Sequence, residues 1–570
     1  MRERRICADH RYLLVPVGRQ KYNFVSTEGI QILQLFQGET LKEEYELTLD
    51  ETHDLLAPER YSLREQSMGT IYEADYYELR LRLTGGNEAL LDTLRLSDRY
   101  VDEPPIYREP LRPQCHFSPA HGFMNDPNGL LYHNGVYHYF SQLNPFGCTP
   151  CNTHWLHAVS RDLCHWQELP YAILPGPEGR IYSGCGVMDE KNVSGLGEKG
   201  QGPMLLFYTA AGSKSRWSRG KAFEIALAYS TDEGKTFRKY EGNPVVANIA
   251  FANRDPKVAW VPEWGLWVMA IFLDSDRYQL LTSQNLLDWT PSQILAIPGS
   301  AECPDLFRIR LEGTEQWKWV FWGCTDNYLV GHMEEGLFVP EGDYIPGPSH
   351  KIYTPDWVNA RSTGGYAAQT YFGAPEGRII QHSWLRPRTE DTPFLFCASI
   401  ANELRLVPTR EGPRLRVLPA KEIGHMYEHV YEVRNRGFEE FERLPKDIFS
   451  ECMDISFTVD IQGDRVLAFA LRGVLIAYEP ATGHLLLPTG AFDIGKGLTH
   501  LEFRFVTDRL SIEIYVNDGA FNTAVCQPLQ PFETALKPVL AEPGFSFDLS
   551  VRRLSSIWAS PERTERERES

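Results

Sequence analysis

The sequence lacks long apolar segments and an excess of basic charge. No stretch approaches 18 uncharged apolar residues, so we expect no transmembrane helix. The 57 lysines and arginines are outnumbered by 76 acidic residues, which gives a net charge of −19. Because phosphate groups are bound by clustered basic side chains, this balance argues against nucleic acid or an anionic membrane as the main partner.

We also expect neither an export signal in the first residues nor a disulfide framework. The first residues, MRERRICADHRYLLVPVG, are basic, but the apolar run that follows spans only about five residues and no small-residue cleavage site comes after it. The 11 cysteines are odd in number and irregularly spaced. We therefore expect free thiols and a cytoplasmic location. Cys148 and Cys151 in CTPC have metal-motif spacing, but no second pair accompanies them, and we interpret them as loop cysteines.

Helical periodicity is scarce, and strand-like patterns dominate. Aromatic residues make up 12% of the chain, which suits sheet packing and the binding of sugar rings. Asn134-Gly135 lies between two short aromatic runs and predicts a hairpin. The segment LSIEIYVNDG alternates apolar and polar residues, which predicts a half-buried strand that enters a turn at 517–519. One helix candidate covers 419–433.

At roughly 150 residues per domain, a chain of 570 residues has room for about three or four domains. Proline-rich DEPPIYREPLRP closes the first region, and acidic motifs recur through the second. We expect the following organisation: an accessory β module at 1–110, a central domain at 111–412, a linker with a short helix at 413–432, a third β region at 433–558 and a charged tail at 559–570.

Three acidic motifs stand out in the central region. They are FMNDPNG with Asp126, NRDPKVAW with Arg254 and Asp255, and AECPDLF with Glu302. Each acid lies one or two residues before a proline, and the residue before proline is restricted to extended geometry. Since proline also interrupts strand ladders, we expect these acids at strand ends, where they could converge on the axis of a propeller.

Converging carboxylates suit the hydrolysis of a glycosidic bond. One ionised carboxylate attacks the anomeric carbon, and one protonated carboxyl group gives its proton to the leaving oxygen. Negative neighbours separate the two pKa values, because ionisation of one acid raises the pKa of the next. An adjacent arginine can keep one acid ionised and can hold sugar hydroxyls.

The blocks HFSPAHGFMNDPNGLLYHNGVYHYFSQLNP, NRDPKV and ECPDLF resemble, in order, the signature blocks of glycoside hydrolase family 32, which contains invertases, inulinases and levanases. The resemblance covers about 111–558. It implies an all-β protein: a five-bladed β-propeller catalytic domain followed by a C-terminal β-sandwich, here preceded by a small N-terminal β module.

The resemblance also implies roles for single residues. Asp126 matches the nucleophile, Glu302 the general acid and base, and Asp255 the transition-state stabiliser. The implied reaction retains configuration, with the two reacting carboxyl groups about 5–5.5 Å apart and with no metal or organic cofactor. The implied substrate-binding residues are Asn125, Gln142, Ser183, Arg254 and Tyr366.

The sequence departs from the family pattern around the acids. Aromatic side chains that are common in the family are lost or changed at several positions: Phe123, Pro150, Tyr182, Ala301 and Gly364-Gly365. Because the three acids are kept while the pocket walls differ, we expect a short fructo-oligosaccharide or an unusual fructose disaccharide as substrate in preference to plain sucrose.

Two alternatives stay open. The same site could pass fructose to another sugar, as a fructosyltransferase or a cyclising enzyme, or the chain could be a non-catalytic fructan-binding protein. For residues 1–110 we favour assembly into a homo-oligomer, or shaping of the propeller rim, over independent sugar binding. The seven histidines between His116 and His165 are irregularly spaced, and we interpret them as packing and turn residues.

Overall fold

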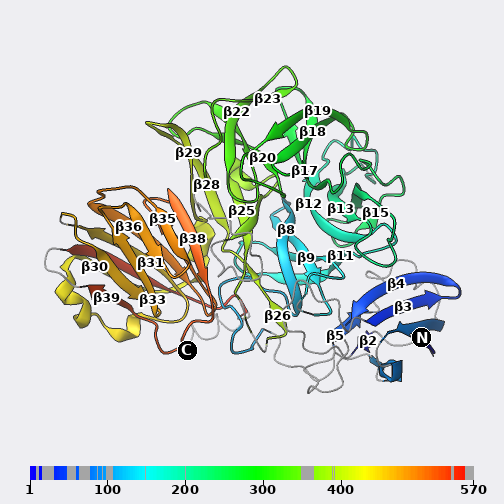
Figure 1. The fold of residues 1–570 in the computed structure, drawn as a ribbon, viewed down its shortest axis with the longest axis horizontal. Coiled ribbons are helices and arrows are strands. Elements are labelled where there is room, and N and C mark those ends of the chain that lie inside the picture. Colours follow the sequence, from blue (N-terminus) through cyan, green and yellow to red (C-terminus); the bar gives the residue numbers. More distant parts are fainter. Residues whose placement is uncertain are drawn as a thin grey trace.

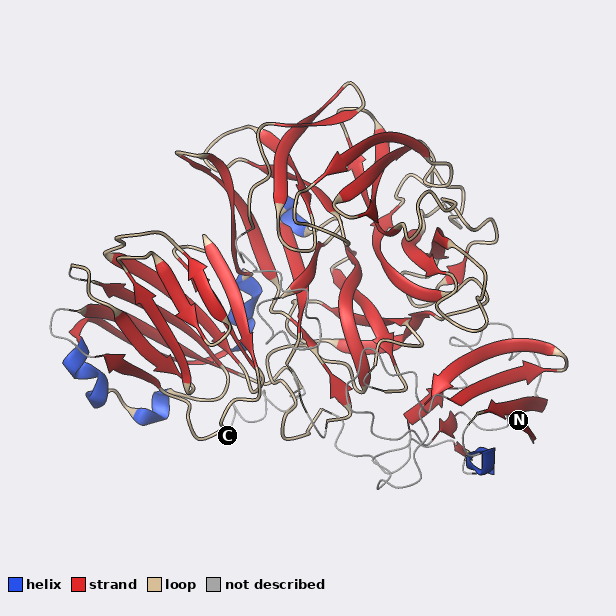
Figure 2. Cartoon of the chain, in the orientation of Figure 1, coloured by secondary structure: helices blue, strands red, loops and turns tan. Residues whose placement is uncertain are grey.

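The chain is almost entirely β-structure (Figure 2). The computed structural model describes residues 1–7, 12–15, 31–47, 59–62, 78–85, 88–92, 94–97, 107–147, 149–198, 200–347, 365–387, 389, 392–461, 463–540 and 545–558. Helices within these ranges are short 3-10 turns, and none is long and apolar enough to cross a membrane. The predicted all-β class is confirmed.

The described part of the amino-terminal module contains two small antiparallel sheets. In the larger one the apolar residues Leu33 and Leu35 alternate with polar neighbours, as do Leu81 and Leu83, so one face of the sheet is buried. The larger sheet has the order β1 (Arg2–Cys7), β6 (Glu78–Thr84), β3 (Gln31–Gln37), β4 (Thr40–Leu47), and the smaller one β5 (Glu59–Ser62), β2 (Tyr12–Val15), β7 (Arg95–Ser97), with a 3-10 helix at Glu88–Asp92.

Five antiparallel sheets follow one another along the central region and form the blades of a propeller (Figure 1). Blade 1 has β8 (Gly122–His133), β9 (Val136–Asn144), β10 (His154–Ser160) and β11 (Gln167–Ile173). Blade 2 has β12 (Arg180–Met188), β13 (Met204–Ala211), β14 (Phe223–Ser230) and β15 (Arg238–Lys239). Blade 3 has β16 (Arg254–Val261), β17 (Leu266–Asp274), β18 (Arg277–Ser283) and β19 (Thr290–Ala296).

Blade 4 has β20 (Asp305–Arg310), β21 (Trp317–Trp322), β22 (Tyr328–Glu334) and β23 (Leu337–Pro340). Blade 5 has β24 (Tyr366–Thr370), β25 (Ile379–Leu385), β28 (Asn402–Thr409) and β29 (Gly412–Pro419), with β27 (Cys397–Ala398) beside β25. Between β25 and β27, the short β26 (Phe394–Leu395) pairs in parallel with β8 and so ties blade 5 to blade 1.

The first strands of neighbouring blades contact one another around the ring. The strands within each blade are antiparallel. The start of the first strand, the end of the second strand and the start of the third strand therefore lie at the same end of the blade. The starts of all five first strands therefore meet at one face of the propeller. We call it the acid face.

The third body is a two-sheet sandwich packed beside the propeller (Figure 1). A large apolar core, which includes Phe457, Phe469 and Phe503, fills the space between the sheets. One sheet has β30 (Tyr427–Gly437), β40 (Ser546–Leu554), β31 (Met453–Asp460), β36 (His500–Thr507), β37 (Ser511–Val516) and β38 (Phe521–Cys526). The other has β35 (Gly490–Asp493), β34 (His484–Leu487), β33 (Val474–Glu479), β32 (Leu467–Leu471) and β39 (Leu536–Leu540).

The structure confirms both predicted turns but corrects two other predictions. Asn134 and Gly135 have positive φ angles between β8 and β9. Strand β37 is buried on both faces, not on one, because its second face packs on the propeller. The predicted helix at 419–433 is wrong beyond Met426: only a 3-10 helix at Lys421–Met426 forms, and β30 follows. The expected linker at 413–432 therefore includes most of β29 and the start of β30.

Candidate active site

The three predicted acids come from the first strands of three different blades. Asp126 lies in β8, Asp255 is the second residue of β16, and Glu302 lies three residues before β20. All three are near strand starts and therefore at the acid face. A register shift in each of β8 and β16 accommodates the proline that follows the acid.

Two side chains join the three acids into one cluster. The Cys303 thiol lies 3.6 Å from Oδ2 of Asp126 and 3.6 Å from Oδ2 of Asp255. Arg254 donates from Nη2 to Glu302 Oε1 at 2.8 Å, and its Nε lies 3.5 Å from Asp255 Oδ2. The sequence pattern thus brings its three acids and its arginine together on the propeller axis.

Asp126 is held by polar neighbours from blades 1 and 2. Ser183 donates to its Oδ2 at 2.7 Å, Gln142 donates to the same oxygen at 3.3 Å, and Asn125 also hydrogen-bonds this carboxylate. Burial raises the pKa of Asp126, the Ser183 hydroxyl opposes the rise, and the charge of Glu302 adds to it. Three of the predicted substrate-binding residues therefore contact the predicted nucleophile.

Asp255 is the most buried of the three acids. Burial raises its pKa to about 7; Arg254 opposes the rise, whereas Glu302 and Asp126 add to it. Its backbone N–H donates to Thr209 Oγ1 at 2.8 Å, and its Oδ2 accepts the Cys303 N–H at 3.1 Å. This carboxyl group is thus held in one orientation inside the cluster.

Glu302 is more exposed than Asp255, with side-chain exposed fractions of 30% and 6%, which suits a group that meets both a leaving group and water. Its Oε2 accepts a hydrogen bond from the Tyr366 hydroxyl at 2.8 Å, and its Oε1 accepts one from the Arg254 guanidinium. Tyr366, predicted as a substrate-binding residue, is thus placed against the predicted general acid. The Cys324 thiol in turn lies 3.2 Å from the Tyr366 hydroxyl.

The backbone at two of the acids corrects the prediction of extended geometry. Asp255 has φ 61° and Glu302 has φ 61°, and Cys303, which directly precedes Pro304, has φ 36°. These are left-handed conformations that cost free energy in residues with side chains and persist only where the surroundings enforce them. At Asp255, the hydrogen bonds to Thr209 and Cys303 hold the left-handed conformation in place.

Several contributors were missed by the sequence argument, although they lie inside the motifs. Cys303 directly follows Glu302, and Asn128 lies in the NDPNG block. Asn128 accepts the Gly184 N–H at 3.0 Å and so locks blade 1 to blade 2 beside Ser183. Gly184 cannot be replaced there, because an added Cβ would lie 1.9 Å from the Phe207 carbonyl oxygen.

The departures from the family pattern fall in different environments. Phe123 is buried and packs on Phe396 with a ring-centroid distance of 5.2 Å, in a cluster that also contains Tyr366. Pro150 accepts a hydrogen bond from Arg180. Gly364 lies outside the described residues, as does Cys148 of the CTPC motif.

Other groups of titratable residues form structural networks. The His138 and His157 rings contact each other at 3.0 Å, and burial lowers the pKa of both.

Cys115, Cys452 and Asp508 have ligand atoms within 4.8 Å of one another. The Asp508 carboxylate already accepts the His116 ring and a series of backbone N–H groups, however, and burial raises the pKa of the Cys115 thiol. This set therefore fits a hydrogen-bonded network better than a metal site.

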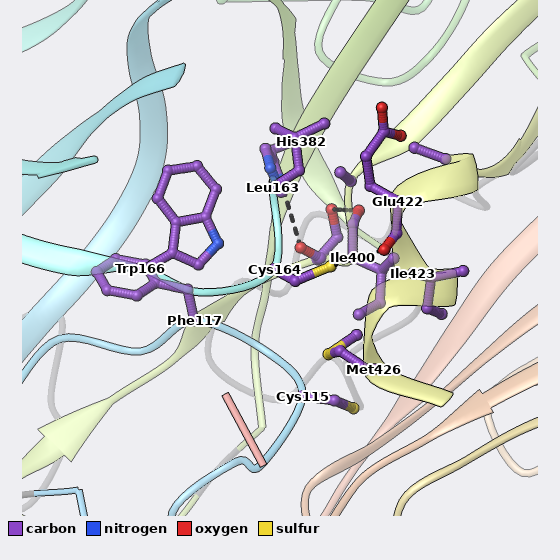
Figure 3. A pocket seen from close by; sticks show the side chains of 13 residues that line it. Cys115, Phe117, Leu163, Cys164, Trp166, His382, Ile400, Glu422, Ile423 and Met426 are labelled. Atoms are coloured by element: carbon purple, nitrogen blue, oxygen red, sulfur yellow. Dashed lines mark hydrogen bonds between the residues drawn. The ribbon is translucent and has the colours of Figure 1, made fainter. Parts of the chain in front are cut away.

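A small pocket of about 10 Å³ lies between Trp166, His382 and the 3-10 helix at Lys421–Met426 (Figure 3). It has room for about one water molecule and none for a sugar ring. Its lining includes none of the acids or their partners. The acid cluster, not this cavity, is the candidate site.

A five-bladed propeller with three linked carboxylates on its axis, joined to a β-sandwich, places the chain among the propeller-type glycoside hydrolases. Residues 116–419 match the sequence profile described as "Glycosyl hydrolases family 32 N-terminal domain". The chain belongs to this family, as its motifs indicated.

Curated relatives agree with this assignment. The levanase of Bacillus subtilis (strain 168) is 35% identical over 358 residues, which cover 59% of this chain and 50% of the levanase. The levanase of Bacillus sp. (strain L7) is 29% identical over 530 residues, covering 80% of this chain and 54% of that protein. The invertase of Schizosaccharomyces pombe is 39% identical over 254 residues, 40% of this chain and 42% of the invertase. The chain spans about half the length of these relatives.

Solved structures confirm the fold. An exo-inulinase from Aspergillus awamori superimposes with a TM-score of 0.65 at 24% identity, covering 79% of this chain and 100% of that one. A fructofuranosidase from Schwanniomyces occidentalis, complexed with fructosylnystose, gives a TM-score of 0.63 at 22% identity and covers 80% of this chain and 100% of that one.

Proposed function

We propose that this chain is a retaining glycoside hydrolase that releases fructose from β-fructofuranosides. The observation that carries the proposal is the cluster in which Cys303 contacts Asp126 and Asp255 while Arg254 contacts Asp255 and Glu302. Relatives named levanase, invertase and exo-inulinase support a fructose-containing sugar as the substrate class.

We propose the following roles, which the family resemblance implies and which the contacts within the cluster support. The Asp126 carboxylate attacks the anomeric carbon of fructose while Glu302 gives its proton to the departing oxygen, so a fructosyl ester forms on Asp126. Glu302 then takes a proton from water, the water oxygen bonds to the same carbon, and the ester bond to Asp126 breaks. Asp255 and Arg254 hold fructose hydroxyls, and no step calls for a metal or an organic cofactor.

We also propose a substrate preference. The pocket walls that the family commonly lines with aromatic residues are changed here, and we propose a short fructo-oligosaccharide or an unusual fructose disaccharide in preference to sucrose. A panel of sucrose, kestose, inulin and levan, with products resolved by chromatography, tests this preference. Equal turnover of all four would contradict it, and products longer than the substrate would instead indicate transfer.

The assignment of the nucleophile has its own test. Asp126→Asn keeps the size of the side chain but removes the attacking charge, so turnover should fall by several orders of magnitude while kestose still binds. Turnover is measured by fructose release and binding by calorimetry. Unchanged turnover in this variant would reject the mechanism. A cytoplasmic location also remains our proposal, to be tested by fractionation of the source cells.

A further inference from the structure

The amino-terminal module docks on the same face of the propeller that carries the acids. Asn144, at the end of β9, pairs with Phe123 near the start of β8, so the loop 145–153 lies at the acid face. Ala211, at the end of β13, pairs with Arg180 at the start of β12 and places the next loop there too. Strand β4 of the module contacts both loops and Arg180 itself, and in Figure 1 the module lies beside blades 1 and 2, away from the sandwich.

The contact is built from both backbone and side chains. The Glu46 N–H donates to Asn152 Oδ1 at 2.7 Å, and Asn152 Nδ2 donates back to the Glu46 carbonyl oxygen at 2.8 Å. Tyr45 is buried and packs on Phe146 with a ring-centroid distance of 4.6 Å. On blade 2 the Trp217 N–H donates to the Glu44 carboxylate at 2.8 Å. These contacts fix β4 against the rim of the site.

One ion pair continues from the module toward the acids. Glu46 Oε2 accepts Arg180 Nη2 at 2.5 Å, and both side chains are largely buried, with exposed fractions of 16% and 13%. Arg180 also donates to the Pro150 carbonyl oxygen at 3.3 Å. Tyr182 lies two residues further along β12. Its phenol group interacts electrostatically with the charges of Arg180, Arg254 and Asp255. Two side chains thus separate the module's carboxylate from the acid cluster.

We propose that the amino-terminal module forms part of the substrate site: Glu46 is a positioning residue that, through Arg180, fixes the Pro150 and Tyr182 wall against which the leaving sugar of a short fructoside binds. This inference rests on the proposed function and deepens it. The direct neighbours of Asp126 hold the fructosyl unit, whereas Glu46 and Arg180 lie one layer further out. The pair should therefore act on the part of the substrate beyond that unit.

The test compares Glu46→Gln with Glu39→Gln in the full chain. Glu39 is on the same module, but its side chain is 96% exposed and, among the described residues, pairs with Arg80. Three quantities are measured for each variant: KM and kcat for kestose, the inhibition constant of free fructose, and the melting temperature. Fructose fills only the pocket next to Asp126, so its inhibition constant separates the two parts of the site.

For Glu46→Gln we expect KM for kestose to rise about tenfold, equivalent to about 1.4 kcal/mol, while the fructose inhibition constant stays unchanged. Glu39→Gln should match the parent protein. The double variant Glu46→Arg with Arg180→Glu exchanges the two charges and should restore part of the lost affinity for kestose. A variant that is merely unfolded would show no such recovery. An unchanged KM in Glu46→Gln would overturn the inference, as would a parallel rise of the fructose inhibition constant. A parent protein that hydrolyses no fructoside would instead reject the proposed function.

Discussion

At the scale of single residues, the charge balance of the acid cluster governs its chemistry. Asp126 and Asp255 both have raised pKa values, although a guanidinium lies beside Asp255. Burial outweighs the attraction of Arg254, because the charged form of a carboxyl group loses more hydration than the neutral form when water is excluded. In the proposed mechanism both groups act in the ionised form, so their raised pKa values should limit activity in acid.

The pH profile of kcat/KM tests this charge balance. Since protonation inactivates both carboxylates, activity should be lost as the pH falls, with an acid limb well above the ordinary carboxyl pKa of 3.8 and approaching 7. In Asp255→Asn the slower residual activity should keep an acid limb but at lower pH, because a negative neighbour of Asp126 is gone. An acid limb below pH 4 in the parent protein would contradict the assigned environments.

An exposed aromatic residue at the same rim offers a second test. Phe251 is 96% exposed and lies three residues before Arg254, at the acid face. Aromatic rings in such positions stack on sugar rings, so Phe251→Ala should raise KM for oligosaccharides several-fold with little change in melting temperature. Phe532→Ala is the matched control, because Phe532 is 79% exposed on the sandwich. Equal KM values for the two variants would exclude Phe251 from the site.

At the scale of elements, a buried histidine links the propeller to the sandwich. His116 Nδ1 contacts Asp508 at 2.9 Å and its Nε2 contacts Glu513 at 2.9 Å. Burial alone would lower the pKa of His116, but the two carboxylates outweigh it and raise the value to about 9. A charged histidine is therefore the form that fits this joint.

Replacing His116 should weaken the joint in a pH-dependent way. His116→Gln leaves two buried carboxylates without their cation, which should cost about 3–5 kcal/mol of unfolding free energy. Because the folded pKa lies above the unfolded value of 6.5, the stabilisation is complete below pH 6.5 and is lost as the pH rises through 9. The difference in melting temperature from the parent should shrink over that range.

The exposed pair of His500 and Asp460 provides the control for this prediction. His500→Gln should change the melting temperature far less at every pH, because exposed ion pairs contribute little. A difference between parent and His116→Gln that stays constant from pH 6 to pH 9.5 would contradict a charged His116.

The elements also show which parts of the fold are predictable from sequence. The turns at Asn134-Gly135 and 517–519 were predicted because their residues favour positive φ locally. The burial of the second face of β37 could not be predicted in this way. It depends on the contact of Glu513 with His116, which lies almost 400 residues earlier in the sequence. Likewise β30 forms because it pairs with β40, a partner that the helix-like pattern at 419–433 does not reveal.

At the scale of the whole molecule, the propeller carries the acids, the sandwich braces blade 5, and the amino-terminal module borders the site. The sequence motifs were sufficient to predict the family and the acid cluster, since each motif places its acid near a strand start. They were not sufficient to predict Glu46 or Arg180, because that contact joins segments 134 residues apart with no motif at either end. Assembly through the module remains a prediction.

The central claim is that Asp126 carries the fructosyl group during turnover. The most direct measurement is mass spectrometry of acid-quenched Glu302→Gln after incubation with a fructoside whose leaving group needs no protonation. That variant can form the ester but is slow to hydrolyse it, because the base for water is gone. We predict a protein heavier by one fructosyl unit, with the added mass on the peptide that contains Asp126. An unmodified protein, or a label on another peptide, would contradict the account.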